Sequence, residues 1–201
     1  MAALRFIPNA LCILRMLLVL PVVGLLLRRE FFLTMWLFAF AAFTDGLDGF
    51  LAKRCGWTSE LGKILDPLAD KILLIGVFIT LAAIGLVPPW LAAVAVSRDV
   101  IISAGAIVYN SLYGDPQGNP TSISKLNTLC QVGYVLLVVG TQAVDIVPER
   151  LVWLAVTVLG AMVFVTTVVS GIDYVLTYSR KAIAANRQRH GGAPNDVGTP
   201  S

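Results

Sequence analysis

The chain has 201 residues, of which 57% are hydrophobic and only 13% are charged, and its mean hydropathy is +0.82. Soluble domains carry about a quarter charged residues, so this composition excludes a soluble globular domain, a disordered chain and a disulfide-rich secreted scaffold. The net charge of +3 is too small to indicate a nucleic-acid-binding protein.

Long apolar runs predict helices that cross a membrane, because a bilayer requires about 20 apolar residues per helical span. We expect six such spans, over residues 11–27, 31–51, 64–86, 90–109, 126–144 and 151–178. These runs are long and continuous, which favours helices over strands. The predicted fold class is an all-α integral membrane protein, a six-transmembrane-helix bundle with a polar cavity at its cytoplasmic side.

The ends and loops of the chain give an expected orientation. From His190 onward the chain holds Gly, Pro, Asn and Ser without apolar periodicity. We expect one membrane domain over residues 1–181 and a disordered cytoplasmic tail over residues 182–201. Lys and Arg collect on the side of both termini and of the loop between the second and third spans. The positive-inside tendency therefore predicts cytoplasmic termini, in the inner membrane of the cell.

The acidic residues near the second and third spans are the most informative feature. Asp45 and Asp48 lie three residues apart, and Asp66 and Asp70 lie four apart, so each pair shares one helix face. The connecting loop is short, which predicts that the two helices are antiparallel neighbours whose acidic faces meet. Charged residues at the edge of apolar helices are expensive in lipid and indicate a functional site.

Like charges gathered in a medium of low dielectric constant must be compensated by protons or cations. Carboxylate oxygens suit hard cations such as Mg²⁺ or Mn²⁺, and four of them hold two divalent ions in many phosphoryl-transfer sites. The alternative is a set of helix caps and ion pairs with Lys63 and Lys71, which we consider the weaker interpretation for four acids at helical spacing. Lys71 itself is expected to pair with an acid or to reach the membrane surface.

These residues together resemble the signature of the CDP-alcohol phosphotransferases, D-x2-D-G-x2-A-R-x8-G-x3-D-x3-D. Seven of its eight defining positions match in the string Asp45-x2-Asp48-Gly49-x2-Ala52-Lys53-x8-Gly62-x3-Asp66-x3-Asp70. Lys53 stands where the family usually has Arg. The ammonium of Lys is a point charge, whereas the planar guanidinium of Arg binds a phosphate with two donors, so the contact to the nucleotide phosphates is weaker unless Arg54 takes it over. Six spans with the signature between the second and third also resemble this family.

The resemblance implies a reaction and a role for each residue. Two ions, Mg²⁺ or Mn²⁺, would be held by Asp45, Asp48, Asp66 and Asp70, and Asp70 would also be the general base. The donor would be CDP-diacylglycerol, and CMP would leave. The residues implied to bind the donor nucleotide are Gly49, Ala52, Lys53, Arg54 and Gly62. The resemblance further implies a homodimer embedded in membrane lipids.

The acceptor is predicted to be a glycerol-based molecule bound by Arg98, Lys125, Asn127 and Thr128. Arg98 and its neighbour Asp99 are expected to point to different faces of their helix, which favours Arg98 reaching a substrate phosphate over an ion pair between the two. Asn127 stands where the phosphatidylglycerophosphate synthases of this family typically carry a second Lys, and Ala106 stands where they carry a second Arg. A dianionic phosphomonoester would therefore lack two cations.

Two acceptors and one other class of protein stay open. The form Ser124-Lys125-Leu126-Asn127-Thr128 resembles the eukaryotic-type cardiolipin synthases, as does Thr44 before Asp45. This resemblance, with the missing cations, favours phosphatidylglycerol as acceptor over glycerol 3-phosphate. A cation transporter that uses the four acids as an ion site is the alternative from another class, although transporters commonly carry inverted repeats and none is visible.

Overall fold

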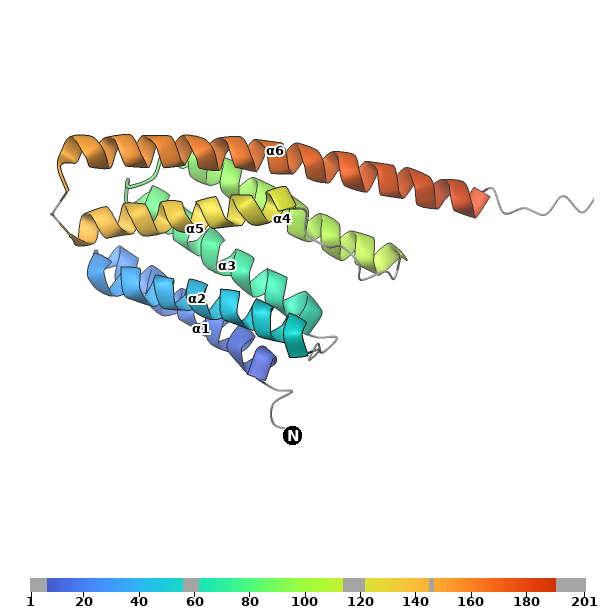
Figure 1. Ribbon diagram of the computed structural model, residues 1–201, viewed down its shortest axis with the longest axis horizontal. Coiled ribbons are helices and arrows are strands. Elements are labelled where there is room, and N and C mark those ends of the chain that lie inside the picture. The colour runs from blue at the N-terminus through green and yellow to red at the C-terminus, as the bar shows by residue number, and fades with distance from the viewer. Residues whose placement is uncertain (1–6, 56–61, 114–121, 145–146, 191–201) are drawn as a thin grey trace, which may run out of the picture.

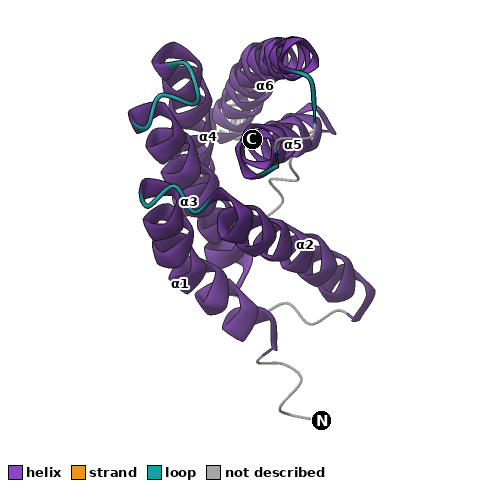
Figure 2. Ribbon diagram, turned by 90° about the vertical axis from the view of Figure 1, so that its left-hand side faces the viewer, coloured by secondary structure: helices purple, strands orange, loops and turns teal. Residues whose placement is uncertain are grey.

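The computed structural model describes the backbone of residues 7–55, 62–113, 122–144 and 147–190, and the side chains of residues 14, 16–44, 71–105, 123–144 and 147–177. Within these ranges the chain forms helices and no strands (Figure 1, Figure 2). The six helices are α1 (Ile7–Leu27), α2 (Phe31–Cys55), α3 (Gly62–Ala83), α4 (Pro89–Tyr113), α5 (Ser122–Ala143) and α6 (Glu149–His190). The all-α class is confirmed, and each predicted span coincides with a helix.

The turn after α1 and the turn after α3 share a residue with positive φ and a backbone hydrogen bond back to the preceding helix. After α3, Gly85 has a φ of 80° and Leu86 N–H donates to the carbonyl of Leu81 at 2.9 Å, which satisfies a carbonyl at the helix end. After α1, Arg29 has a φ of 60° and Glu30 N–H donates to the carbonyl of Leu25 at 3.0 Å. Both turns reverse the chain within a few residues, so each joins two antiparallel helices.

The bundle has two layers of three helices each. In one layer α3 packs between α1 and α4, and in the other α5 packs between α2 and α6 (Figure 2). The layers meet where α1 packs on α2, α3 on α5, and α4 on α6. Successive helices run in opposite directions (Figure 1). The last turns of α2 and the first turns of α3 therefore lie at the same end of the bundle.

This arrangement corrects one expectation. Although α2 and α3 follow one another in the chain, the described residues do not pack them extensively against each other. They belong to different layers and lie diagonally, with α1 and α5 as shared neighbours. A short connection brings helix ends together, but it does not require the two helices to pack along their lengths.

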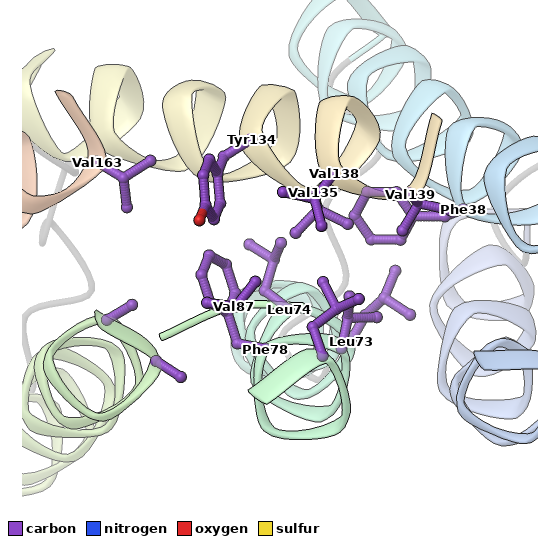
Figure 3. Close-up of a cluster of buried hydrophobic side chains, with 14 of the residues drawn as sticks. Phe38, Leu73, Leu74, Phe78, Val87, Tyr134, Val135, Val138, Val139 and Val163 are labelled. Atoms are coloured by element: carbon purple, nitrogen blue, oxygen red, sulfur yellow. The ribbon is translucent and has the colours of Figure 1, made fainter. Parts of the chain in front are cut away.

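The core lies between the layers and is centred on α3. Five of its side chains, Leu73, Leu74, Val77, Phe78 and Leu81, are at most 4% exposed. Phe78 stacks on Tyr134 of α5, with ring centroids 6.2 Å apart and planes 18° apart (Figure 3). Burial of such side chains contributes about 1.5–3 kcal/mol each when water is the reference solvent. The core thus holds α3, the helix that carries Asp66 and Asp70, in place.

The outer faces are also apolar, which indicates association with a membrane. Leu20, Phe43, Leu129 and Trp153 are each 68% or more exposed. Large exposed apolar surfaces mark membrane or protein interfaces. Two segments of the described residues, Ile123–Ala143 and Glu149–Thr177, are long and apolar enough to cross a membrane, and three shorter apolar helices accompany them.

Helix α6 differs from its predicted extent. The span was expected to end near Tyr178 and the tail to be disordered from residue 182, but the helix continues to His190. Hydropathy marks only the apolar part of a helix. The polar continuation of α6 contains Lys, Ala, Arg and Gln, which are good helix formers, and contains no Gly or Pro before residue 191.

Candidate active site

The four signature acids lie on helical backbone at one end of the bundle. Asp45 and Asp48 belong to the C-terminal half of α2, and Asp66 and Asp70 belong to the first half of α3. The predicted helical spacing within each pair is thus present in the backbone. Their side chains lie outside the described residues, and so do those of Lys53, Arg54 and Ala52, which with Gly49 occupy the last turns of α2. Gly62 is the first residue of α3.

The donor set itself fits divalent metal ions. Four carboxylates supply only oxygen ligands, which is the set that Mg²⁺ and Mn²⁺ prefer and that Zn²⁺ sites rarely use. Among the residues whose side chains are described, no group of three or more His, Cys, Asp or Glu could hold a metal. The oxygen chemistry of the signature acids makes them the candidate ligands.

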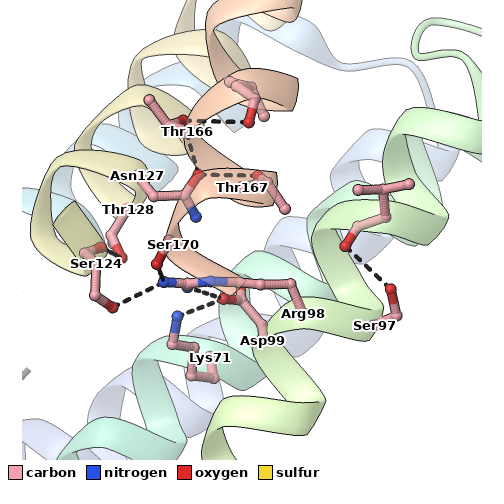
Figure 4. A network of polar contacts seen from close by, with 12 residues as sticks. Lys71, Ser97, Arg98, Asp99, Ser124, Asn127, Thr128, Thr166, Thr167 and Ser170 are labelled. Atoms are coloured by element: carbon pink, nitrogen blue, oxygen red, sulfur yellow. Dashed lines mark hydrogen bonds and ion pairs between the residues drawn. The ribbon is translucent and has the colours of Figure 1, made fainter. Parts of the chain in front are cut away.

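A buried polar network begins one residue after the signature. Lys71 Nζ lies 2.6 Å from Asp99 Oδ1, and Arg98 Nη1 donates to the same oxygen at 2.5 Å (Figure 4). The expectation that Lys71 pairs with an acid is confirmed. The expectation that Arg98 and Asp99 point apart is wrong, because the long arginine side chain bends back along α4 far enough to reach its neighbour.

Arg98 also joins three helices. It is 5% exposed, and its Nη2 donates to Ser124 Oγ of α5 at 2.8 Å and to Ser170 Oγ of α6 (Figure 4). Its Nε has no hydrogen-bond partner among the described residues. A buried arginine with an unpartnered donor is unusual, since nearly all buried polar groups are hydrogen-bonded.

Asn127 forms a second link between α5 and α6. Its side chain is 0% exposed, and its Oδ1 accepts hydrogen bonds from Thr166 Oγ1 and Thr167 Oγ1, each at 2.9 Å (Figure 4). Its Nδ2 has no partner among the described residues. The oxygen of Asn127 is therefore committed to packing, and only the amide nitrogen is left for a ligand.

The other two predicted acceptor residues differ in their surroundings. Thr128 is half-buried and its hydroxyl donates to the carbonyl of Ser124 at 3.2 Å, within α5. Lys125 is exposed. The structure thus brings Arg98, Asn127 and Thr128 to one corner between α4, α5 and α6, and leaves Lys125 at the surface beside it.

Sequence reasoning did not single out the hydroxyl groups of α6. Thr166, Thr167 and Ser170 come three or four residues apart, or side by side, in a largely apolar stretch of α6. That spacing places them along one face, which is the signal that would have indicated a polar contact with a neighbouring helix.

A groove lies next to this corner, between α4 and α6. Its volume is about 430 Å³, within the range of small-molecule sites. Most of its lining is apolar, and Ser97, Arg98, Thr167 and Tyr174 are its polar members. The hydroxyl of Tyr174 donates to the carbonyl of Ile102 at 3.1 Å and so bridges the two helices at the groove.

Comparison with known proteins shows that the chain is similar to one protein family. The profile of the CDP-alcohol phosphatidyltransferases matches residues 5–169. The chain is 37% identical over 143 residues to a human (Homo sapiens) protein named cardiolipin synthase (CMP-forming), covering 63% of this chain and 47% of that protein. Thus the chain spans about half the length of the curated relatives of this kind.

The chain is also similar to proteins that are named as a different transferase. A Bacillus subtilis CDP-diacylglycerol–glycerol-3-phosphate 3-phosphatidyltransferase is 32% identical over 139 residues, which is 69% of each chain. A chloroplastic enzyme of the same name from rice (Oryza sativa subsp. japonica) is 31% identical over 182 residues, covering 79% of this chain and 53% of the relative.

Proposed function

Because this chain belongs to the CDP-alcohol phosphatidyltransferase family, we propose that it transfers a phosphatidyl group from CDP-diacylglycerol to a glycerol-based acceptor and releases CMP. The observation that carries the proposal is the placement of two acid pairs, at helical spacing, on adjoining ends of α2 and α3 in an apolar bundle. Charged residues within apolar helices indicate a functional site, and four carboxylates at this spacing suit divalent ions that assist phosphoryl transfer.

Asp45, Asp48, Asp66 and Asp70 would hold two divalent ions, Mg²⁺ or Mn²⁺. When bound, such ions neutralise the charge that develops on the phosphate oxygens during transfer. The residues assigned to the donor nucleotide, Gly49, Ala52, Lys53, Arg54 and Gly62, adjoin the acids in the chain. The glycines leave room for close approach of a ligand to the backbone, and the two cations attract the pyrophosphate.

Asp70 would act as general base. It accepts the proton of the acceptor hydroxyl while that oxygen forms a bond to the phosphorus that bears the diacylglycerol. The bond between this phosphorus and the bridging oxygen breaks, and CMP leaves with the electron pair. Lys71 and Asp99 contribute indirectly, since their 2.6 Å contact fixes the turn of α3 that carries Asp70.

The acceptor we favour is phosphatidylglycerol, so that the product is cardiolipin. Arg98 is already paired with Asp99, which leaves little positive charge for a dianionic phosphomonoester and suits a monoanionic phosphodiester. Arg98, Lys125, Asn127 and Thr128 are the proposed acceptor residues. Glycerol 3-phosphate is the runner-up, and the bacterial and plant relatives named for it support that choice.

The proposal includes a place in the cell. All six helices would cross the inner membrane, with both termini and the signature acids on the cytoplasmic side in a polar cavity. The alternating helix directions and the predicted excess of Lys and Arg on that side support this orientation. We also propose a homodimer, as the family resemblance implies.

The function is tested with the full-length protein in lipid nanodiscs. CDP-diacylglycerol and Mg²⁺ are added with phosphatidylglycerol or with glycerol 3-phosphate, and both CMP and the lipid product are quantified by mass spectrometry. We expect CMP release and cardiolipin formation with phosphatidylglycerol. Consumption of glycerol 3-phosphate alone would establish the runner-up, and metal-dependent ion flux without turnover would establish a transporter.

An Asp70→Asn variant tests the general base. It should lose activity by a factor of about 100 or more, the usual contribution of general-base catalysis. The matched control is Glu149→Gln, which neutralises an exposed acid at the opposite end of the bundle and should retain wild-type turnover. Full activity of Asp70→Asn would overturn the assignment.

A further inference from the structure

The groove between α4 and α6 opens to the side of the bundle. Four of its apolar lining residues, Ile101, Ile172, Val175 and Leu176, are 53–58% exposed. The groove lies at the edge where the two layers of helices meet. In a chain that spans a membrane, a side opening of this kind faces lipid, so a lipid molecule reaches it without passing through water.

The shape and lining suit a hydrocarbon chain. From Val94 to Ile102 the groove follows α4 for about 12 Å, eight residues at about 1.5 Å each. Gly171 has no side chain to fill it, and a Cβ there would meet only Arg98 Cγ, at 4.0 Å. A flexible apolar chain fills such a space at no cost in unsatisfied polar groups.

The groove also contains a charged side chain, that of Arg98. Among the described residues, two of the five N–H donors of this side chain have no hydrogen-bond partner, and the buried Nε is one of them. An arginine donates to phosphate oxygens in a charge-assisted bond. A ligand with a phosphodiester next to an acyl chain would complete the hydrogen bonding of Arg98 and fill the groove at the same time.

Arg98 is connected to the end of the bundle that carries the signature acids. Arg98 and Lys71 share the same oxygen of Asp99, at 2.5 Å and 2.6 Å, and Lys71 follows Asp70 in the chain. The groove is flanked by α4 and α6 and not by α2, where half of the signature lies. Its occupant is therefore better suited to be the acceptor than the CDP-linked donor.

We propose that the groove binds one acyl chain of a glycerophospholipid acceptor, whose phosphodiester lies at Arg98. This inference rests on the proposed transferase function and deepens it, because it requires the acceptor to be a lipid that enters sideways from the bilayer.

The test replaces a groove residue by tryptophan in the full-length protein. In Ile172→Trp the indole occupies the groove, so the KM for long-chain phosphatidylglycerol should rise about tenfold, the size of effect that one or two lost methylene contacts have in an apolar pocket. The KM for dihexanoyl phosphatidylglycerol should change much less, because its short chains do not need the groove. The KM for CDP-diacylglycerol should stay unchanged.

The matched control is Val169→Trp, an exposed α6 residue, 45% accessible, that does not line the groove. It should behave as wild type with both acceptors. An equal shift for long and short acceptors, a shift in the KM for CDP-diacylglycerol, or no shift at all would overturn the groove assignment. Absence of turnover in the wild-type protein with every acceptor would contradict the proposed function instead.

A second measurement needs no variant. Phosphatidylglycerol with a photoreactive diazirine in one acyl chain is reacted with the wild-type protein in nanodiscs, and cross-linked peptides are mapped by mass spectrometry. We expect labels within residues 94–102 and 167–176, and competition by unlabelled long-chain phosphatidylglycerol. Labels spread evenly over all outward helix faces, without competition, would mean that the groove is only part of the lipid-facing surface.

Discussion

Lys71 Nζ and Asp99 Oδ1 lie 2.6 Å apart, although 28 residues separate them in the chain. The aspartate side chain is 3% exposed, and its same oxygen accepts from Arg98. One carboxylate is thus shared by two cations, and it ties α3 to α4 at the turn that follows the last signature acid.

Removal of this carboxylate should destabilise the bundle. In Asp99→Ala the buried guanidinium of Arg98 loses its ion pair and Lys71 loses its 2.6 Å contact, which we expect to lower the free energy of unfolding by about 3 kcal/mol. Asp99→Asn retains the shape but not the charge and should be intermediate. Unfolding in mixed detergent micelles measures both, with Glu149→Ala as an exposed control. A stability equal to wild type for Asp99→Ala would show that the contact carries little weight.

This network shows what sequence reasoning could and could not give for the site. Arg98 was singled out because an apolar helix does not tolerate a charge without a partner, whereas Asn127 and Thr128 were singled out only through the family resemblance. Their partners were not predicted. Helix geometry separates Arg98 from Asp99 by about 100° at 3.6 residues per turn, but a side chain with four rotatable bonds overrides that angle. The contacts with α6 depend on packing between distant segments.

A second prediction concerns the link between α5 and α6. Asn127→Ala leaves Thr166 and Thr167 without their shared acceptor, and the loss should be about 1 kcal/mol, in the range measured for hydrogen bonds between membrane helices. Thr167→Val, which nearly preserves shape, removes one of the two bonds. If Asn127 and Thr167 act through this bond, the double variant should cost less than the sum of the single variants.

Strict additivity in that cycle would contradict the link, because independent sites add and coupled ones do not. The matched control is Thr141→Val, also on α5. Among the described residues, the one partner of its hydroxyl is the carbonyl of Val138, in its own helix. Its combination with Thr167→Val should be additive.

The fold was more accessible to sequence reasoning than the site. Apolar runs located the six helices of the described residues, because hydropathy is a property of a single segment. The two-layer order of helices was not accessible, since it depends on which faces interlock. The diagonal relation of α2 and α3 follows from α1 and α5 packing against both helices. The extension of α6 to His190 carries no hydropathy signal at all.

A third prediction concerns the close approach of Gly105 and Tyr174. A Cβ at Gly105 would clash with the hydroxyl of Tyr174, so the ring must shift, and we expect its 3.1 Å bond to the carbonyl of Ile102 to be weakened or lost. Gly105→Ala should therefore lower stability by about 1 kcal/mol despite the better helix propensity of alanine. Gly133→Ala is the matched control, because a Cβ there meets nothing within 4 Å and should be neutral or stabilising.

Thermal unfolding of the two alanine variants, followed by circular dichroism in the same detergent, compares them directly. An equal melting temperature for both would mean that Tyr174 adapts freely. Because Tyr174 lines the α4–α6 groove, Gly105→Ala should also raise the KM for long-chain phosphatidylglycerol, whereas Gly133→Ala should not.

The last prediction concerns metal removal. A site made only of carboxylate oxygens should bind Mg²⁺ or Mn²⁺ and release it to a chelator, so EDTA should abolish CMP release by the purified protein. Added Mg²⁺ or Mn²⁺ should restore it. Zn²⁺, which prefers nitrogen and sulfur ligands, should restore less.

A single acid variant sharpens the test of metal binding. Asp45→Asn removes one charge from the four carboxylates and should raise the Mg²⁺ concentration for half-maximal activity by about tenfold or more. Loss of a residue that only hydrogen-bonds to a metal ligand already lowers metal affinity or activity by about 10–100-fold. Asp173→Asn changes an acid on α6, a helix that does not pack extensively on α2 or α3 among the described residues, and should leave that concentration unchanged. Activity that persists in EDTA, or an equal shift in both variants, would refute metal binding by the signature acids.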